Sequence, residues 1–440
     1  MNVGGSHRAA RFLRYFPEHG IETTVFALDP AGPGVPYLKA HIDDSLLEDF
    51  PESVRILRLP SDPARIQPSN PILRKIEGYF RIHANEGVAW EAYLKRAMLV
   101  RAAEEPPDVL LVTAPPFSMV TQGVRFARRL RVPLVLDMRD PWSTWVLDPH
   151  ATYAHYRITL AVEGRCFKAA SNIVLNSEET REDIRRLHPS VPAHKFHVIT
   201  NGYSTDVDSF AVPSTDIQAK RFTIGYVGSF YYLPDARERM MSTWRSRRGH
   251  RRLLYIRVRE DWKYRSPWFF FRAVRALLDA HPELSSRVEI RIVGAEHASP
   301  YLLDMVEEWG LQEQVHLLPT IDHSGALRFQ ASCDALLITS SKVIDGRSYS
   351  IAGKTFEYLV QNKPIVAFTP KGAQKALLEK TGLALFCDPD APERSAAQLY
   401  DLISGNVSFH PNEAFLRSLH VKELAESLAG ILHTAAEHGS

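Results

Sequence analysis

The segment from Ser348 to Phe368 contains the residues best suited to binding a charged ligand. Gly353 and Lys354 stand at the predicted start of a helix, and Glu357 follows three residues later. A loop of free backbone amides with a lysine suits a diphosphate, and a carboxylate can accept two hydrogen bonds from a ribose diol. The same residues would also fit a solvated lysine and a first-turn glutamate that the helix dipole stabilises. The pattern therefore indicates a nucleotide site without excluding a structural role.

Two further glycine turns are candidates for binding an anion. Gly4 and Gly5, with Ser6, lead into a helical apolar pattern, and Gly228 and Ser229 follow a strand-like run. Each turn would present backbone N–H groups at a helix N-terminus, where negative charge is favoured. Glycine is also used in such turns for steric reasons alone, so neither turn is specific for a ligand by itself.

Arg139 and Asp140 come directly after the apolar, strand-like run Pro133–Met138. Side chains at the carboxyl ends of parallel strands reach the ligand-binding edge of an α/β sheet, so this pair is a candidate for acceptor binding. A structural ion pair is the alternative. His7 is either a base that assists an acceptor hydroxyl or a solvated residue. The histidines form no HExxH motif and no pair at metal-ligand spacing with acids, so no metal site is predicted.

Strand-like and helix-like runs alternate along the chain in βαβα order, twice over. Short apolar runs such as DVLLVT (Asp108–Thr113) are typical of parallel strands buried on both faces. This order predicts an α/β protein with two Rossmann-like, doubly wound parallel sheets that face each other across a cleft. The predicted parts are an N-terminal domain at 1–205, a hinge at 206–218, a C-terminal domain at 219–405, and helices at 406–440 that pack back on the N-terminal domain.

The composition is that of an ordinary globular protein of 440 residues, with a formal net charge of +2. A hydrophobic fraction of 45% excludes a disordered chain, and the near-neutral charge gives no basic field of the kind a dedicated nucleic-acid binder has. Three widely separated cysteines favour a reducing compartment over a disulfide framework. No apolar run approaches the roughly 18 residues of a membrane span, and no signal-peptide core opens the chain. We therefore expect a cytoplasmic protein that makes any membrane contact at the bilayer surface.

Several segments together resemble family 4 glycosyltransferases of the GT-B fold. Residues 4–28 (GGSHRAARFLRYFPEHGIETTVFAL) are similar to the start of the acceptor domain, and PDVLLVTAPPFS and HKFHVITNGYSTDVDSF are similar to its later strand and hinge segments. FTIGYVGSF, VEIRIVGA and GKTFEYLVQNKPIVA resemble the donor domain. The order and spacing of these segments extend the resemblance from residue 4 to about residue 430.

The resemblance implies transfer of a sugar from a nucleotide-sugar, with retention of anomeric configuration and without a metal ion or resident cofactor. The departing nucleoside diphosphate gains negative charge, which fixed amides and cations can stabilise in the transition state. Arg265 and Lys354 are therefore candidate catalytic residues at the diphosphate, and Asp140, at its strand end, is the third. The resemblance assigns the nucleotide to Gly228, Ser229, Thr320, Ile321, Gly353 and Glu357. The candidate substrate-binding residues are Gly4, Gly5, His7, Arg139 and Asp345.

Two positions depart from the family's pattern. The glutamate that usually stands eight residues before the one matched by Glu357 is Tyr349 here, and Asp345 is the nearest acid to replace it. The arginine that usually follows the donor-domain glycine is Ser229. The identity of the donor sugar therefore does not follow from the sequence.

A basic insert, at about residues 235–262, interrupts the donor domain. Between Asp235 and Glu260 it has nine arginines against three acids. A basic stretch with aromatic residues can dock on anionic lipid headgroups or on a polyprenyl diphosphate acceptor, whereas nucleic-acid binding and a solvated loop are the alternatives. The helical region from Ile72 to Ala103 either is a second membrane face or packs on the acceptor sheet.

We expect a glycosyltransferase that acts on a polysaccharide or polyprenyl-linked acceptor in cell-envelope glycan synthesis, at the cytoplasmic face of the membrane and with no nucleic-acid partner. Tyr349 and Ser229 favour a different class, an inactive GT-B relative that serves as a binding or scaffold subunit. A sugar-nucleotide epimerase of the same architecture is a third hypothesis, which would be expected to show more acids and histidines at the cleft.

Only Met1–Val3 precede the first glycine turn, whereas such a turn normally follows a strand. The turn leads into a helix that Ser6 is predicted to cap and Gly20 to close. In the strand order 3-2-1-4-5 the preceding strand would be central, so its absence would leave a groove between the strands expected at Ile21–Leu28 and Asp108–Thr113. We therefore expect the upstream DNA to encode an apolar strand that ends in one or two prolines.

Overall fold

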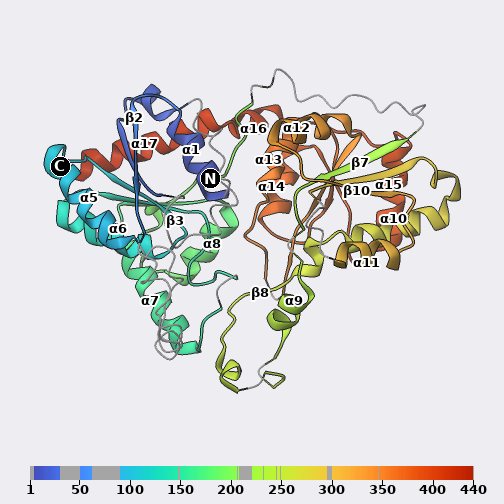
Figure 1. Cartoon of the computed structure of the whole chain (residues 1–440), viewed down its shortest axis with the longest axis horizontal. Coiled ribbons are helices and arrows are strands. Elements are labelled where there is room, and N and C mark those ends of the chain that lie inside the picture. The colour runs from blue at the N-terminus through green and yellow to red at the C-terminus, as the bar shows by residue number, and fades with distance from the viewer. Residues whose placement is uncertain are drawn as a thin grey trace. The chain divides into compact units, whose positions relative to one another are not determined.

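The computed structural model describes residues 4–29, 50–61, 90–146, 149–205, 207, 221–230, 232–243, 245–247, 249–294, 300–344 and 346–439. The chain forms two compact units (Figure 1). Unit 1 comprises Met1–Ser204, Trp244–Arg257 and His420–Ser440, and unit 2 comprises Thr205–Thr243 and Val258–Leu419. The chain therefore passes between the units four times, and neither unit is one continuous stretch of sequence. The predicted hinge at 206–218 lies outside the described residues, apart from residue 207.

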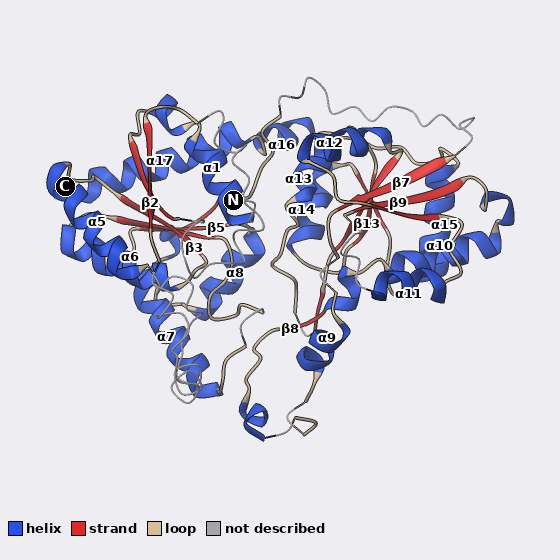
Figure 2. Cartoon of the chain, viewed as in Figure 1, coloured by secondary structure: helices blue, strands red, loops and turns tan. Residues whose placement is uncertain are grey.

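The strands of unit 1 form two parallel sheets, shown in red in Figure 2. The larger sheet has the order β3-β4-β5-β6, with β3 (Leu110–Ala114), β4 (Leu134–Met138), β5 (Asn172–Leu175) and β6 (Phe196–Val198). The smaller sheet pairs β1 (Thr23–Leu28) with β2 (Val54–Leu59). Every residue of β4 is buried, as expected of a parallel strand covered on both faces.

Helices cover both faces of the larger sheet. Alternate side chains of β4 point to opposite faces, so Leu134 and Leu136 join one apolar cluster and Val135 joins another. The first cluster includes residues of α6, α7 and α8, and the second includes residues of α1, η1 and α17. The bounds of these helices are α1 (Gly4–Leu13), η1 (Phe16–His19), α6 (Ser118–Leu130), α7 (Tyr153–Ala169), α8 (Glu178–Leu187) and α17 (Val421–Gly439).

The first helix differs from its prediction at both ends. α1 begins at Gly4, so Ser6 lies within the first turn and is not the capping residue. It ends at Leu13, and Gly20 instead closes the short 3-10 helix η1, with a left-handed φ of 70°. The difference at the C-terminal end arises because the chain turns after Leu13 and starts a second short helix before the strand.

Part of the helical region predicted from Ile72 to Ala103 lies outside the described residues. The described part, α5 (Glu91–Glu104), packs through Leu94 on Met119 and Phe126 of α6. This arrangement agrees with packing onto the sheet of unit 1.

Among the described residues, β1 pairs with β2 alone and β3 pairs with β4 alone. All residues of β1 are only partly buried, and Leu111 of β3 is 37% exposed. Parallel strands are normally more deeply buried than this.

Unit 2 contains a six-stranded parallel sheet and a two-stranded antiparallel ribbon. The sheet has the order β10-β9-β7-β11-β13-β14, and its strands are β7 (Phe222–Val227), β9 (Val288–Val293), β10 (Val315–Leu318), β11 (Ala335–Thr339), β13 (Ile365–Phe368) and β14 (Ala384–Phe386). The ribbon pairs β8 (Arg259–Asp261) with β12 (Lys342–Ile344). The longer helices are α9 (Pro234–Met241), α10 (Trp268–Ala280), α11 (Pro300–Glu308), α12 (His323–Ser332), α14 (Ala373–Thr381) and α15 (Pro392–Ile403).

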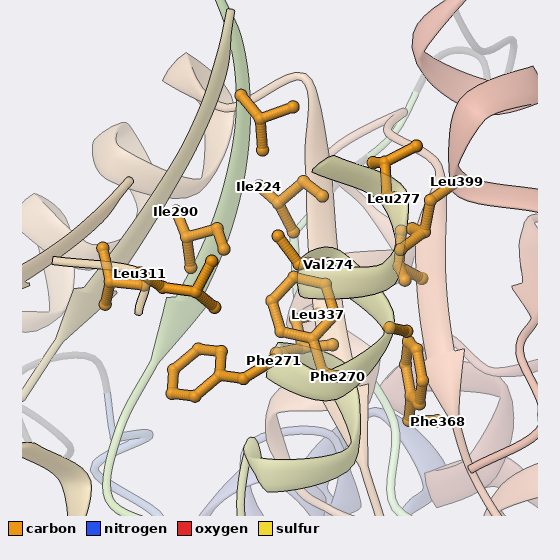
Figure 3. Packing of buried hydrophobic residues seen from close by; sticks show 14 of the residues in the cluster. Ile224, Phe270, Phe271, Val274, Leu277, Ile290, Leu311, Leu337, Phe368 and Leu399 are labelled. Atoms are coloured by element: carbon orange, nitrogen blue, oxygen red, sulfur yellow. The ribbon is translucent and has the colours of Figure 1, made fainter. Parts of the chain in front are cut away.

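The core of unit 2 is centred on α10, between the sheet and α15. Figure 3 shows Phe270 and Phe271 of α10 among apolar side chains of the sheet. Phe270 meets Phe368 of β13 edge-on, with ring centroids 5.6 Å apart. Burying a phenylalanine of this kind contributes about 1.5–3 kcal/mol to folding. The parallel sheets of both units confirm the prediction of two Rossmann-like α/β domains.

A buried ion pair joins the first helix to the centre of the unit 1 sheet. Arg8 of α1 donates to both carboxylate oxygens of Asp137 on β4, at 2.9–3.1 Å, and the two side chains are only 2% and 6% exposed. The remaining N–H groups of Arg8 donate to the backbone carbonyls of Ile199 and Thr200 and to the side-chain oxygen of Asn201. All five guanidinium donors are thus satisfied, which removes most of the cost of burying the charge.

We predict that Arg8→Met lowers the free energy of unfolding by about 3–5 kcal/mol, because it leaves the Asp137 carboxylate buried without its partner. Urea denaturation followed by circular dichroism measures this loss. Arg185→Ala, at an exposed position of α8, is the control and should change stability by less than about 0.5 kcal/mol. Equal urea midpoints for Arg8→Met and wild type would contradict the prediction.

Candidate functional site

Two glycines stand at the carboxyl ends of neighbouring strands in unit 2. Gly228 follows β7 with a φ of +106°, and Gly294 follows β9 with a φ of +92°. A Cβ on Gly294 would lie 3.3 Å from the backbone of Gly228, and one on Gly228 would lie 3.0 Å from the amine of Lys354. Glycine is therefore required here both by conformation and by the close approach of backbone and lysine.

Lys354 points at this glycine turn from the first residue of α13 (Lys354–Leu359). Its amine lies 3.6 Å from the centre of the Tyr226 ring. Burial lowers the pKa of Lys354 to about 7, although the nearby Glu357 carboxylate opposes this shift; the Arg265 guanidinium lowers the pKa further. α13 has only six residues, so side chains rather than a helix dipole supply the charge at this site.

Glu357 lies one turn further along α13 and is half-buried. Gln330 of α12 donates its side-chain amide to a Glu357 carboxylate oxygen at 3.4 Å, and Gln361 donates to Gln330 at 3.2 Å. This chain of amides restrains the carboxylate, whose charge is close enough to Lys354 to raise the pKa of the amine. The structure thus brings together four of the predicted residues: Gly228, Arg265, Lys354 and Glu357.

Arg265 ends η6 (Trp262–Arg265), the short 3-10 helix after β8. The hydroxyl of Thr339, at the end of β11, donates to the backbone carbonyl oxygen of Arg265 at 2.7 Å. This bond ties η6 to the carboxyl edge of the six-stranded sheet. Arg265 is close enough to Lys354 and to Glu260 to shift the pKa of both.

Glu260 is a polar residue at this edge that the sequence analysis counted only as an acid of the basic insert. Its side chain is fully buried, and its Oε2 accepts a hydrogen bond from the indole of Trp262 at 3.1 Å, whereas Oε1 has no hydrogen-bond partner. Burial raises the pKa of Glu260, and the Arg265 charge opposes that shift. No sequence signal predicts this burial, because it arises from pairing of β8 with β12, about 80 residues away.

Two further hydroxyls at this edge also depend on strand pairing and have no local sequence signal. Ser340 follows β11 and Thr369 follows β13, directly beyond the register pair Thr339–Phe368. Both are buried, and neither hydroxyl has a hydrogen-bond partner. Single serines and threonines after strands are common, so only the strand register shows that these two are neighbours. Ser340 and Thr369 are therefore neighbouring buried hydroxyls with unsatisfied hydrogen-bonding capacity.

The other predicted nucleotide residues are more exposed. Ser229 and Gly353 are exposed, and the carbonyl of Ser229 accepts a hydrogen bond from Tyr226 at 3.2 Å. Thr320 and Ile321 are exposed after β10, which lies two strands, or about 10 Å, from β7. Asp345 lies outside the described residues. The buried Tyr349 occupies the position at which the family pattern has a glutamate.

The predicted acceptor-side residues belong to unit 1. Gly4 and Gly5 form the first turn of α1, and the half-buried His7 lies in the same helix. Arg139 and Asp140 follow β4, and the Arg139 guanidinium donates to the carbonyl of Pro115. Burial lowers the pKa of Arg139, with Asp137 and Asp140 opposing the shift. The Nε atom of Arg139 is buried without a hydrogen-bond partner.

Glu163 supports the loop that carries these two residues. This fully buried carboxylate of α7 accepts hydrogen bonds from the backbone N–H groups of Trp142 and Ser143, both at 3.2 Å, and lies 2.8 Å from His188. A single glutamate inside an amphipathic helix gives no sequence signal for this role.

Within the part of the chain that the structure describes, no three histidine, cysteine or acidic side chains are grouped as a metal site. Over the same residues, no helix is long and apolar enough to cross a bilayer.

The sequence matches two protein-family descriptions, one for each half of the chain. Residues 3–202 match "Glycosyl transferase 4-like domain", and residues 266–405 match "Glycosyl transferases group 1". The stretch between the two matched ranges contains the predicted hinge and the basic insert. No curated protein sequence matches the chain.

Solved structures with the same fold cover nearly the whole chain. Anabaena Alr3699/HepE in complex with UDP has a TM-score of 0.56 and 16% identity, over 99% of this chain and 98% of that chain. Sucrose-phosphate synthase from Thermosynechococcus elongatus has a TM-score of 0.55 and 12% identity, over 99% and 92%. Trehalose 6-phosphate synthase from Burkholderia multivorans has a TM-score of 0.55 and 12% identity, over 95% and 99%.

We predict that Lys354 titrates near pH 7, because desolvation disfavours its charged form. In protein with ¹³C-methylated lysines, NMR should show one signal that titrates near this pH and is lost in Lys354→Arg. Glu357→Gln should lower the pKa of this signal, since the carboxylate raises it. Lys380→Arg, on α14, is the matched control and should leave the signal in place. Absence of a lysine signal that titrates between pH 6 and 8 would count against the site described here.

Proposed function

We propose that this chain, whose two halves match glycosyltransferase family models, is a family 4-like glycosyltransferase of the GT-B fold that transfers a sugar, with retention, from a nucleotide-sugar donor to a polysaccharide or lipid-linked acceptor of the cell envelope. The observation that carries the proposal is the convergence of two cations and a carboxylate, Arg265, Lys354 and Glu357, on the Gly228 turn. The UDP-bound Anabaena structure of the same fold supports a nucleoside diphosphate as the ligand.

The diphosphate is assigned to Lys354 and Arg265. Without an anion, these two like charges lie close together and Lys354 loses much of its charge near neutral pH. A bound diphosphate supplies the missing counter-charge and raises the pKa of the amine again. When the glycosidic bond breaks, the diphosphate gains further negative charge, so both cations stabilise the transition state more than the ground state. The Gly228 turn allows the phosphate oxygens to approach the backbone closely.

The remaining parts of the donor are assigned to groups around this centre. The Glu357 carboxylate accepts hydrogen bonds from the two hydroxyls of the ribose, and Thr320 and Ile321, about 10 Å away, flank the base. The sugar hydroxyls are assigned to the unsatisfied groups of Glu260, Ser340 and Thr369. These three replace the glutamate that the family pattern has at Tyr349.

The acceptor is assigned to unit 1. Arg139, with its unpartnered Nε, binds an acceptor oxygen or phosphate, and Asp140 orients the attacking hydroxyl and accepts its proton. His7 and the first turn of α1, at Gly4 and Gly5, complete this side. Attack and departure occur on one face of the sugar, so no covalent intermediate is required. We place the reaction at the cytoplasmic face of the cell membrane, where a lipid-linked acceptor is available.

A catalytically inactive scaffold is the second candidate function, because Tyr349 and Ser229 replace two polar residues of the family pattern. The scaffold hypothesis predicts that the unit 2 site binds no nucleoside diphosphate, or binds it without turnover. The two experiments below separate the hypotheses.

We predict that the full chain binds UDP or GDP and that Lys354→Met and Glu357→Gln each weaken this binding by about 10–100-fold. A hydrogen bond to a charged group contributes about 1.5–3 kcal/mol, and 1.4 kcal/mol corresponds to tenfold. Isothermal titration calorimetry measures the affinities. Lys380→Met is the matched control and should bind as wild type does. If neither nucleotide binds the wild-type chain, the transferase proposal fails.

We predict retention of configuration at the anomeric carbon. A panel of UDP- and GDP-sugars identifies the donor that is turned over, with the acceptor or with water. The ¹H NMR coupling constant of the anomeric proton in the first-formed product then reports its configuration. An α-linked donor should give an α-configured product; a β-configured first product would show that the reaction inverts.

A further inference from the structure

Two segments of unit 1 that are far apart in sequence form one exposed surface. The first is the outer face of α7, where Tyr153 is 53% exposed and Ile158 is 46% exposed. The same face carries the exposed side chains of Arg157, Arg165 and Lys168. The only acid of α7, Glu163, is fully buried and so does not contribute to this face. The outer face of α7 therefore combines large apolar side chains with cations alone.

The second segment is residues 245–257 of the basic insert, which belongs to unit 1 although its flanks belong to unit 2. Tyr255 forms an antiparallel bridge with His150, through N–H···O bonds of 2.9 and 3.1 Å. Its ring packs against Tyr153 and Tyr156, with centroids 5.1 and 4.9 Å apart. These contacts hold the insert against the start of α7, so the solvated-loop interpretation does not apply to this segment.

The insert adds more cations and another apolar side chain to the surface. Arg245, Arg252 and Arg257 are exposed, and Leu253 between them is 59% exposed. The sequence from 245 to 257 contains no aspartate or glutamate. Arg247 is turned inward and donates to the carbonyl of Leu254 at 2.6 Å, which fixes the turn before Leu253. The docking surface thus consists of Tyr153, Arg157, Ile158, Arg245, Arg252, Leu253 and Arg257.

We propose that this docking surface binds a membrane that contains anionic phospholipids. A bilayer surface offers negative headgroups directly above an apolar interior, and this matches arginines interspersed with exposed leucine, isoleucine and tyrosine. A nucleic acid offers negative charge without an apolar layer, so Ile158 and Leu253 would have no partner there. The inference rests on the proposed membrane-bound acceptor, because docking would bring unit 1 to the lipid that carries it.

The test uses the full chain and vesicles without donor or acceptor. Co-sedimentation with vesicles of phosphatidylcholine, with and without 30% phosphatidylglycerol, should show at least tenfold tighter binding to the anionic vesicles at about 0.1 M salt. One arginine near an anionic membrane contributes about fivefold to binding. The triple variant Arg245→Gln, Arg252→Gln, Arg257→Gln should therefore lose at least tenfold on anionic vesicles.

A matched control tests whether vesicle binding depends on this surface or only on net charge. A second variant tests the apolar side chains, and urea midpoints test whether the variants are folded. Arg128→Gln, Arg129→Gln, Arg185→Gln removes three arginines from exposed positions of α6 and α8 and should retain more than half of the binding affinity. Ile158→Ser with Leu253→Ser should weaken binding at least threefold while all arginines are kept. Urea midpoints equal to that of wild type show that the variants are folded.

The proposal is overturned if wild type does not distinguish the two vesicle types, if the docking-surface triple binds as tightly as wild type, or if a 20-base-pair DNA or RNA duplex binds more tightly than anionic vesicles. Nucleotide calorimetry is measured in parallel. UDP or GDP binding that persists in the triple variant, together with lost vesicle binding, supports the surface. Vesicle binding by a wild-type chain that binds no nucleotide would refute the proposed transferase function and leave the membrane surface standing.

Discussion

The ion pair of Arg8 and Asp137 is the interaction on which unit 1 depends most directly. It connects the first helix, the central strand β4 and the carbonyls after β6 through one guanidinium. Asp137 lies two residues before Arg139, and the charges of Arg8 and Asp137 both influence the Arg139 guanidinium. The element that holds α1 on the sheet is therefore also part of the electrostatic environment of the candidate acceptor residues.

In unit 2, the parallel sheet brings chemically functional residues together at one edge. All six strands end on the same side, so the residues that follow them meet there although they are far apart in sequence. Gly228, Gly294, Ser340 and Thr369 each follow a different strand, and Lys354 and Arg265 reach the same edge from short helices. The glycines leave space, the hydroxyl residues offer hydrogen bonds, and the lysine and arginine supply positive charge. A close-packed core around Phe270 and Phe271 fixes the strands and so holds this edge in place.

The sequence predicted the order of the strands and helices well, because buried parallel strands are short and apolar and glycine turns mark their ends. It also identified Gly228, Lys354 and Glu357, which share a local pattern with known ligand loops, and the structure places them with Arg265. It did not predict the burial of Glu260, the neighbouring positions of Ser340 and Thr369, or the membership of residues 244–257 of the basic insert in unit 1. Each of these depends on pairing between segments that local periodicity does not report. Gly20 does not close α1 because this helix ends earlier than its apolar pattern, and Ser6 does not cap it because the helix already begins at Gly4.

Because each unit is built from separate stretches of sequence, a single cut in the chain does not yield two complete units. A fragment that stops at Ser204 would lack α17, whose Leu428 and Leu432 cover Val135 and Val174 of the unit 1 sheet, and it would expose that apolar face to water. It would also lack residues 244–257, which contribute Tyr255 to the aromatic contacts of α7. The two units are therefore not exchangeable as continuous stretches: a chimera that replaced unit 2 with that of a relative would have to keep residues 244–257 and the C-terminal helix together with unit 1.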